Sequence, residues 1–152
     1  GLGDVYKRQA YAADTLGEAG IEFIYNFECD EDREINIDPA QFRRVLNNLI
    51  DNSRKYGAED GTAKIMLSVR NGENGHTEIS IEDNGQGVPA DERDKIFETF
   101  YRGDKARTGH KNGSGLGLAI TKQITDRHGA SIRADESELG GLKVIIDLPQ
   151  AK

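Results

Sequence analysis

Residues 38–57 carry the most sharply delimited secondary-structure signal in the chain, and they limit the fold more than any other segment. Asp38 followed by Pro39 is typical of a helix N-terminus, Gln41 is placed to close a capping box, and Gly57 is placed to end the helix. The apolar residues between them recur at helical spacing, at Phe42, Val45, Leu46, Leu49 and Ile50. The pattern predicts an amphipathic helix whose apolar stripe must pack against a second layer.

Alternation of apolar and polar residues on both sides of this helix predicts the strands of a sheet. It occurs over 21–27, and again over 62–70 and 78–82, which are joined by a turn rich in Asn and Gly and so predict an antiparallel hairpin. Further short strands are expected at 35–37, 131–134 and 142–148, and helices at 91–97 and 116–128. This order predicts an α+β fold, a two-layer α/β sandwich with a mixed, mostly antiparallel sheet and helices on one face.

Composition limits the classes of protein that the chain can represent. Its 152 residues suit one soluble domain, which we place at 10–152 after a linker, tag or scar at 1–9. No apolar stretch is long enough to span a membrane, and a single cysteine with three scattered histidines excludes an internal disulfide and a zinc site. A net charge of −7 argues against nucleic-acid binding. We therefore expect no contact with nucleic acid or membrane by this domain itself.

Polar residues gather at the end of the predicted helix. Asn48 and Asn52 are i, i+4 neighbours, and Lys55 and Tyr56 continue the same side one turn further on. Asparagine is a mediocre helix former, because its amide competes for backbone hydrogen bonds. Repeated asparagines beside an apolar stripe are consistent with a bound polar ligand, or with simple solvation and capping.

Glycine accounts for 18 of the 152 residues and is clustered. In the first cluster Asp83 directly follows a predicted strand, and Gly85 and Gly87 place accessible backbone beside its carboxylate, although a surface turn would look similar. The second cluster, 113–118, opens a helix, where exposed N–H groups and the helix dipole favour phosphate. It matches neither the dinucleotide-binding fingerprint nor a P-loop.

The loop before the second glycine cluster, 101–112, is basic. Its charged residues give an excess of three positive charges in an acidic chain: Arg102, Lys105, Arg107 and Lys111 against Asp104. Charge runs of this kind are usually solvated, but the neighbouring glycines favour an anionic ligand here.

The order and spacing of these segments resemble the catalytic ATP-binding domain of bacterial sensor histidine kinases over residues 21–149. The matching motifs are the N box (48–56), the G1 box (83–87), the F box (96–102), the G2 box (113–117) and the glycines 140–141 before a last strand. The resemblance implies the Bergerat ATP-binding fold, shared with gyrase, mismatch-repair and heat-shock chaperone ATPases. It also implies ATP and Mg²⁺ as cofactors.

The resemblance assigns a contact to each polar residue of the first two boxes. Asn52 would ligate Mg²⁺ through its amide oxygen, and Lys55 would touch phosphate. Asp83 would accept a hydrogen bond from the adenine amino group, and Tyr56 would lie along the adenine ring. The backbone of the G1 box would approach the nucleotide at Gly85, Gly87 and Val88.

The basic loop would be the ATP lid, with one hinge near Phe97 and Phe100 and the other in the glycine cluster. Its closure would bring arginine and lysine toward the phosphates, and the sequence does not fix which of them makes contact. The ATP-contacting residues implied in this region are Phe97, Arg102, Lys111, Gly113, Ser114, Gly115, Leu116 and Gly117.

Asn48 separates two branches of the superfamily that the sequence resembles. In its hydrolysing members, and in serine kinases that resemble anti-sigma factors, this position holds a glutamate that acts as general base. An amide cannot accept a proton at neutral pH, so transfer to a histidine is favoured over hydrolysis. Catalysis by Asn48, Asn52 and Lys55 would then consist of placement and charge stabilisation of the γ-phosphoryl group. A nucleotide-binding regulatory module and, less favoured, a gyrase-type hydrolase are the alternatives.

The acceptor histidine is not expected within this chain. His76, His110 and His128 do not sit on a helix followed by an acidic residue and an arginine, as the family's acceptor does. The resemblance thus implies a piece of a longer kinase, often anchored in the inner membrane, with this domain in the cytoplasm. Its partners would be a histidine-containing dimerisation and phosphoacceptor domain of the same protein and a response regulator downstream. One departure is Leu142, which follows the paired glycines where a hydroxyl residue is common.

Overall fold

A computed structural model describes residues 22–28, 38–56, 63–98 and 117–149, with the side chains of 53–56 left outside the description. Within these residues the strands are β1 (Glu22–Glu28), β2 (Lys64–Asn71), β3 (Thr77–Asp83), β4 (Ser131–Glu136) and β5 (Leu142–Leu148). The α-helices are α2 (Pro39–Tyr56) and α3 (Gly117–Arg127), and short 3-10 turns are η2 (Glu73–Gly75), η3 (Ala90–Glu92) and η4 (Lys95–Phe97).

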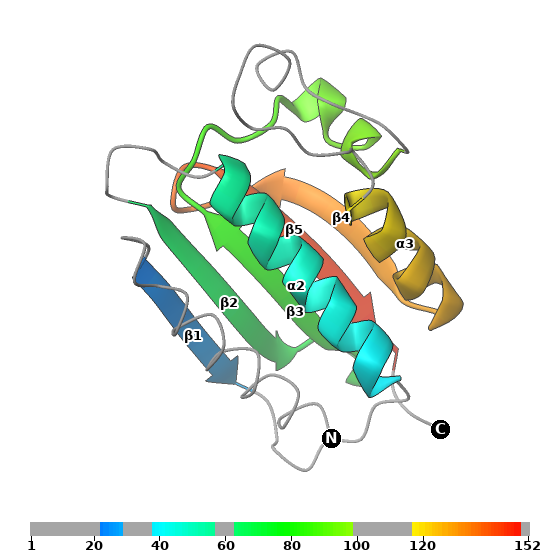
Figure 1. Cartoon of the computed structure of the whole chain (residues 1–152). Helices are drawn as coiled ribbons and strands as arrows, with labels where there is room; N and C mark the ends of the chain where they lie inside the picture. Colours follow the sequence, from blue (N-terminus) through cyan, green and yellow to red (C-terminus); the bar gives the residue numbers. More distant parts are fainter. Residues whose placement is uncertain (1–21, 29–37, 57–62, 99–116, 150–152) are drawn as a thin grey trace.

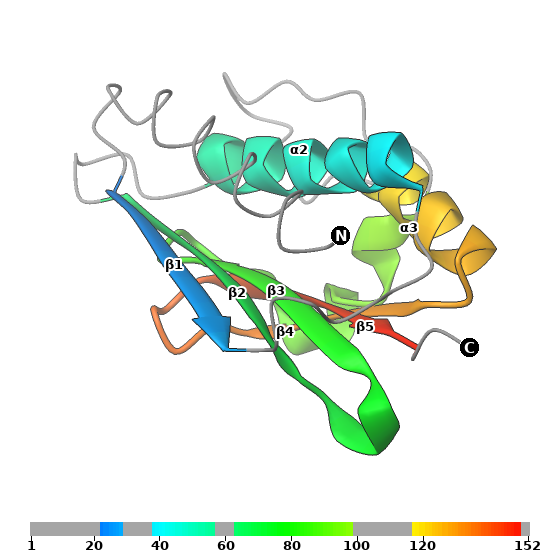
Figure 2. The same cartoon turned by 90° about the horizontal axis from the view of Figure 1, so that it is seen from below.

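The strands form one sheet in the order β1-β2-β3-β5-β4. β1 pairs with β2 in parallel, and the other three pairings are antiparallel. Helices α2 and α3 pack on each other and cover the same face of this sheet (Figures 1 and 2). The predicted two-layer α+β sandwich, including its antiparallel β2-β3 hairpin, is confirmed.

The core lies between α2 and the central strands. Because residues two apart on a strand share a face, the pairing of Leu67 with Ile81 and of Val69 with Ile79 puts one apolar row under the helices. The helix residues that meet this layer are no more than 1% exposed: Val45, Leu46 and Leu49. This packing fixes α2 over the middle of the sheet, so the polar residues near its C-terminal end have a defined position.

The N-terminus of α2 is capped by Asp38, as the sequence predicts. Asp38 Oδ1 accepts hydrogen bonds from the backbone N–H groups of Ala40 (2.9 Å) and Gln41 (3.3 Å). The second half of the predicted capping box is wrong, because the N–H of Asp38 donates to Nε2 of His128 at 3.0 Å and not to the Gln41 side chain. His128 Nδ1 then donates to the carbonyl of Ile124 at 2.8 Å. A histidine 90 residues away was not detectable from local spacing.

Replacing His128 by alanine should therefore cost more stability than replacing Gln41. Loss of the imidazole leaves the exposed N–H of the helix-capping residue to water, and we expect the free energy of unfolding to fall by about 1 kcal/mol. Gln41→Ala, as the matched control, should cost less than about 0.5 kcal/mol. Urea unfolding of both variants tests this, and equal losses would contradict the assignment.

The helix predicted at 91–97 is absent, and the two 3-10 turns η3 and η4 take its place. Their hydrogen bonds run from residue i+3 to residue i, as from Glu92 N–H to the Pro89 carbonyl and from Glu98 N–H to the Lys95 carbonyl, both at 2.9 Å. A segment this short forms too few hydrogen bonds to offset the cost of nucleating an α-helix. In addition, Arg93 donates from Nε to the carbonyl of Val88 at 3.2 Å. The strand predicted at 35–37 lies outside the described residues.

Of the described helices, none is both long and apolar enough to cross a membrane.

Candidate functional site

The polar residues singled out on α2 lie at its C-terminal half. Asn48 and Asn52 are both half-buried, as expected for two residues on one face of α2 at the edge of the packed layer. Among the residues that the structure describes, the amide nitrogen of Asn48 is buried and has no hydrogen-bond partner. Since buried amides are almost always satisfied, this donor favours a polar ligand beside it. Figure 1 shows this end of α2, the end of β3, the turns η3 and η4 and the start of α3 at the same end of the molecule.

Asp83, the last residue of β3, is 3% exposed and is held by backbone donors. Its Oδ1 accepts the N–H of Gly85 at 2.9 Å and the N–H of Leu142 at 3.2 Å, and its carbonyl accepts the N–H of Gly141 at 3.0 Å. These bonds fix the plane and direction of the carboxylate. Leu142 thus binds this carboxylate through its backbone N–H. The kinase domains that the sequence resembles commonly have a hydroxyl side chain at this position.

Glycines bring three backbone segments together around Asp83. A Cβ built on Gly141 would overlap Asp83 Oδ1 and would lie 2.6 Å from both the Asp83 carbonyl oxygen and the Gly85 nitrogen. Gly87 has a φ of +70° and would place a Cβ 3.5 Å from the carbonyl carbon of Gly141. No side chain fits at Gly141 between these stretches of backbone. Sequence reasoning recorded the glycine pair 140–141 without assigning it a contact, and its position directly before a strand was the available signal.

The segment that follows Asp83 is tied to the sheet at two points. Asn84 Oδ1 accepts the N–H of Lys64 at 2.8 Å, at the start of β2. Arg93 donates to the carbonyl of Val88 and places Nη1 3.9 Å from Asp135 Oδ1, near the end of β4. Val88 itself packs half-buried against the core. Sequence reasoning missed both ties, because nothing in the local pattern distinguishes Asn84 or Arg93 from ordinary turn residues.

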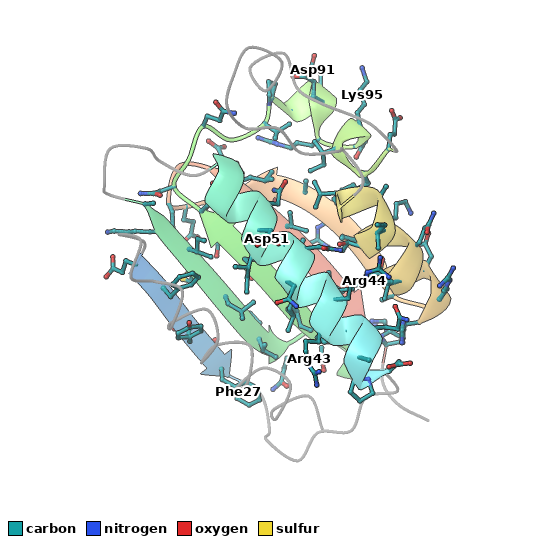
Figure 3. The ribbon with its side chains drawn as sticks, in the orientation of Figure 1. Phe27, Arg43, Arg44, Asp51, Asp91 and Lys95 are labelled. Atoms are coloured by element: carbon teal, nitrogen blue, oxygen red, sulfur yellow. The ribbon has the colours of Figure 1, made fainter. Side chains whose placement is uncertain are left out.

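The turn η4 is anchored in the core at the predicted lid hinge. Phe97 is 8% exposed and belongs to the core cluster, and α3 packs against η4. In contrast, Asp91 and Lys95 are exposed on the same pair of turns, and both are labelled in Figure 3. Gly117 begins α3, and a Cβ added there would meet nothing within 4 Å. The packing of the described residues therefore does not require glycine at this position.

Several predicted site residues fall outside the description. These are the side chains of Lys55 and Tyr56, and the residues Arg102, Lys111, Gly113, Ser114, Gly115 and Leu116. The described residues that the fold places at the end of α2 and β3 are Asn48, Asn52, Asp83, Gly85, Gly87 and Val88.

Sequence comparison finds relatives over most of the chain. The family model for histidine kinase-, DNA gyrase B-, and HSP90-like ATPases matches residues 37–152. The sensor histidine kinase WalK of Bacillus subtilis (strain 168) is 41% identical over 132 residues, which are 87% of this chain and 21% of that protein. WalK of Staphylococcus haemolyticus (strain JCSC1435) is 42% identical over 114 residues, 74% of this chain and 18% of that protein. The chain therefore spans about a fifth of the length of the curated relatives it matches.

Solved structures show the same architecture. The mycobacterial sensor histidine kinase MprB matches with a TM-score of 0.81 and 29% identity, covering 97% of this chain and 94% of that one. The ATP-binding domain of PrrB from Mycobacterium tuberculosis matches with a TM-score of 0.74 and 28% identity, covering 99% and 95%. Because the fold, the family model and the relatives agree, the chain belongs to the histidine kinase-, DNA gyrase B- and HSP90-like ATPase family and is homologous to the catalytic domains of sensor histidine kinases.

Proposed function

We propose that this chain binds ATP with Mg²⁺ and transfers the γ-phosphoryl group to a histidine. The acceptor lies on a separate dimerisation and phosphoacceptor domain of the same longer protein, and a response regulator receives the group downstream. The observation that carries the proposal is the buried Asp83 carboxylate, oriented by backbone N–H groups at the same end of the molecule as the amides of Asn48 and Asn52. Two relatives that are sensor histidine kinases, WalK of Bacillus subtilis and the mycobacterial MprB, support it.

Asp83 recognises the base in this proposal. A carboxylate only accepts hydrogen bonds, so it favours the exocyclic amino group of adenine over the oxo group that guanine and hypoxanthine carry at the same position. Because Gly85, Gly87 and Gly141 carry no side chains, the purine can approach the backbone around this carboxylate. Tyr56 lies along the ring, and Val88 closes the apolar side.

The two asparagines of α2 serve the triphosphate. Asn52 offers an amide oxygen, a hard ligand that suits Mg²⁺ together with phosphate and water oxygens. When bound, the ion neutralises charge on the phosphates. The buried, unpartnered amide nitrogen of Asn48 is a hydrogen-bond donor at neutral pH and does not take up protons, so it orients a phosphate oxygen or a water without activating that water. Lys55 contributes positive charge toward the phosphates.

The remaining contacts come from the stretch between Phe97 and Gly117. Lid closure brings basic residues onto the phosphates, with Arg102 and Lys111 as the contacts we assign. The glycine cluster supplies backbone N–H groups through Gly113, Ser114, Gly115, Leu116 and Gly117. Residues 10–152 make up this domain, which works in the cytoplasm while the full-length protein is anchored in the inner membrane.

Transfer in trans tests the proposal directly. The isolated domain is mixed with Mg²⁺, labelled ATP and a helical hairpin that contains the acceptor histidine, beside the same hairpin with that histidine replaced by glutamine. We expect acid-labile label only on the histidine-containing hairpin, with negligible release of free phosphate by the domain alone. Rapid steady-state phosphate release that disappears in Asn48→Ala would contradict the proposal and favour a hydrolase. Tight ATP binding without label would instead favour a regulatory module.

A further inference from the structure

The turn between β4 and β5 holds the end of β3 from both faces of the sheet. On the face away from the helices, Ser137 Oγ donates to Glu82 Oε1 at 3.0 Å, and these residues are 4% and 2% exposed. On the helix side, Leu142 donates its N–H to the Asp83 carboxylate, and Gly141 donates its N–H to the backbone carbonyl of Asp83. Glu82 and Asp83 are consecutive strand residues, so their side chains point to opposite faces. One turn therefore holds both.

Ser137 also organises the turn internally. Its N–H donates to the Gly141 carbonyl at 2.9 Å, and its carbonyl accepts the N–H of Gly140 at 3.0 Å. Its Oγ accepts the N–H of Leu139 at 2.9 Å while donating to Glu82. A displacement of the Ser137 side chain is thus passed to the backbone of the whole turn.

That displacement reaches Asp83 because the backbone of Gly141 is closely packed against it. The Gly141 backbone already lies so close to the Asp83 carboxylate, its carbonyl and the Gly85 nitrogen that not even a Cβ fits. Movement of the turn must therefore move the carboxylate or break the Leu142 hydrogen bond that orients it.

We propose that Ser137 is a positioning residue for base selection: by donating to Glu82 it fixes the turn that aims Asp83 at the amino group of a 6-aminopurine. The proposal rests on nucleotide binding at Asp83, as proposed above. Ser137 touches no nucleotide itself, so its effect is confined to the interaction that depends on carboxylate orientation. A 6-oxopurine nucleotide has no 6-amino group to donate to Asp83, so its binding depends less on that orientation.

The buried carboxylate of Glu82 explains why the hydroxyl matters. Because Glu82 is 2% exposed, its carboxylate depends on hydrogen-bond donors from the protein. Removal of the Ser137 hydroxyl takes away one of these donors. Glu82→Gln keeps an oxygen that accepts from Ser137, whereas Glu82→Met keeps the length of the side chain without a comparable acceptor. Comparison of these two variants distinguishes the effect of the Ser137–Glu82 hydrogen bond from the effect of the volume that the Glu82 side chain fills.

The test compares dissociation constants for ATP and for inosine triphosphate, each with Mg²⁺, by titration calorimetry. Ser137→Ala should weaken ATP about 3- to 10-fold, the effect of one lost hydrogen bond, and change inosine triphosphate less than about twofold. Glu82→Met should give the same selective loss and stands in if Ser137→Ala does not fold. Glu82→Gln, and Ser131→Ala at the exposed start of β4, should leave both constants within about twofold of the wild type.

The outcomes separate the two proposals. If the wild type binds ATP and the variants lose both nucleotides equally, or lose neither, Ser137 has no part in base selection and this inference is overturned while nucleotide binding stands. If the wild type binds neither nucleotide, nucleotide binding itself fails, and the inference fails with it.

Discussion

Gly141→Ala is expected to abolish nucleotide binding and to lower stability by about 3 kcal/mol, the upper range for overpacking a tight interior. The added methyl group would overlap the Asp83 carboxylate and would lie 2.6 Å from two further backbone atoms. None of these three atoms belongs to the flexible end of a long side chain, so the β4-β5 turn and the end of β3 must separate. Separation breaks the bonds from Gly141 and Leu142 that hold Asp83, and ATP affinity should fall by at least about 100-fold.

Two other glycines isolate the cause of this loss. Gly140 has a φ of +108° but open space around its Cβ position, so Gly140→Ala measures the conformational cost alone, about 1 kcal/mol. Gly72, in the β2-β3 hairpin, has neither a positive φ nor a contact shorter than 3.4 Å. Titration calorimetry and thermal unfolding of all three alanine variants provide the measurement. ATP binding by Gly141→Ala within tenfold of the wild type would show that the close packing at Asp83 is not needed for the site.

The parts of the fold that were predicted from the sequence are those with local causes. Helix α2 follows from a cap, a proline and an apolar stripe that lie within one segment, and the β2-β3 hairpin follows from two alternating runs around a turn. The 91–97 segment was mispredicted as a helix for the same reason, since its local polarity fits a helix while its length does not. Local rules do not decide between competing hydrogen bonds of similar energy.

Non-local contacts account for what sequence reasoning missed. The imidazole of His128 replaces a side chain three residues away as the partner of Asp38, and Ser137 reaches Glu82 across 55 positions. Neither pairing has a spacing rule, because the packing of α2 on α3 and the order of the strands, which bring these segments together, are themselves long-range properties. The motifs predicted Asp83 and the α2 asparagines as site residues, because each box is a short, ordered pattern, and this assignment stays a prediction. What they did not show is that Asn48 holds a buried donor without a partner.

Asp83→Asn is expected to weaken ATP binding by about 100-fold, close to 2.7 kcal/mol, whereas Asn48→Ala should weaken it by less than about tenfold. Oδ1 of Asp83 accepts hydrogen bonds from two backbone N–H groups. This arrangement suits a carboxylate, which has acceptors and no donor. An amide placed there must turn its NH₂ either toward those two donors or toward the amino group of adenine. Both orientations set donor against donor, and both remove the charge that strengthens the bond to the base.

The same substitution should change the order of base preference, which a general loss of stability would not do. The amide that Asp83→Asn introduces can turn its NH₂ group toward the base and donate to a 6-oxo group. Binding of inosine triphosphate should therefore be as tight as in the wild type or tighter, while ATP binding falls. Calorimetry with both nucleotides on Asp83→Asn and Asn48→Ala measures this, with thermal unfolding to verify that each variant is folded. Equal effects of the two substitutions on ATP would mean that adenine does not lie at Asp83. In the proposed site Asn48 faces the phosphates and takes no part in the choice between an amino and an oxo group.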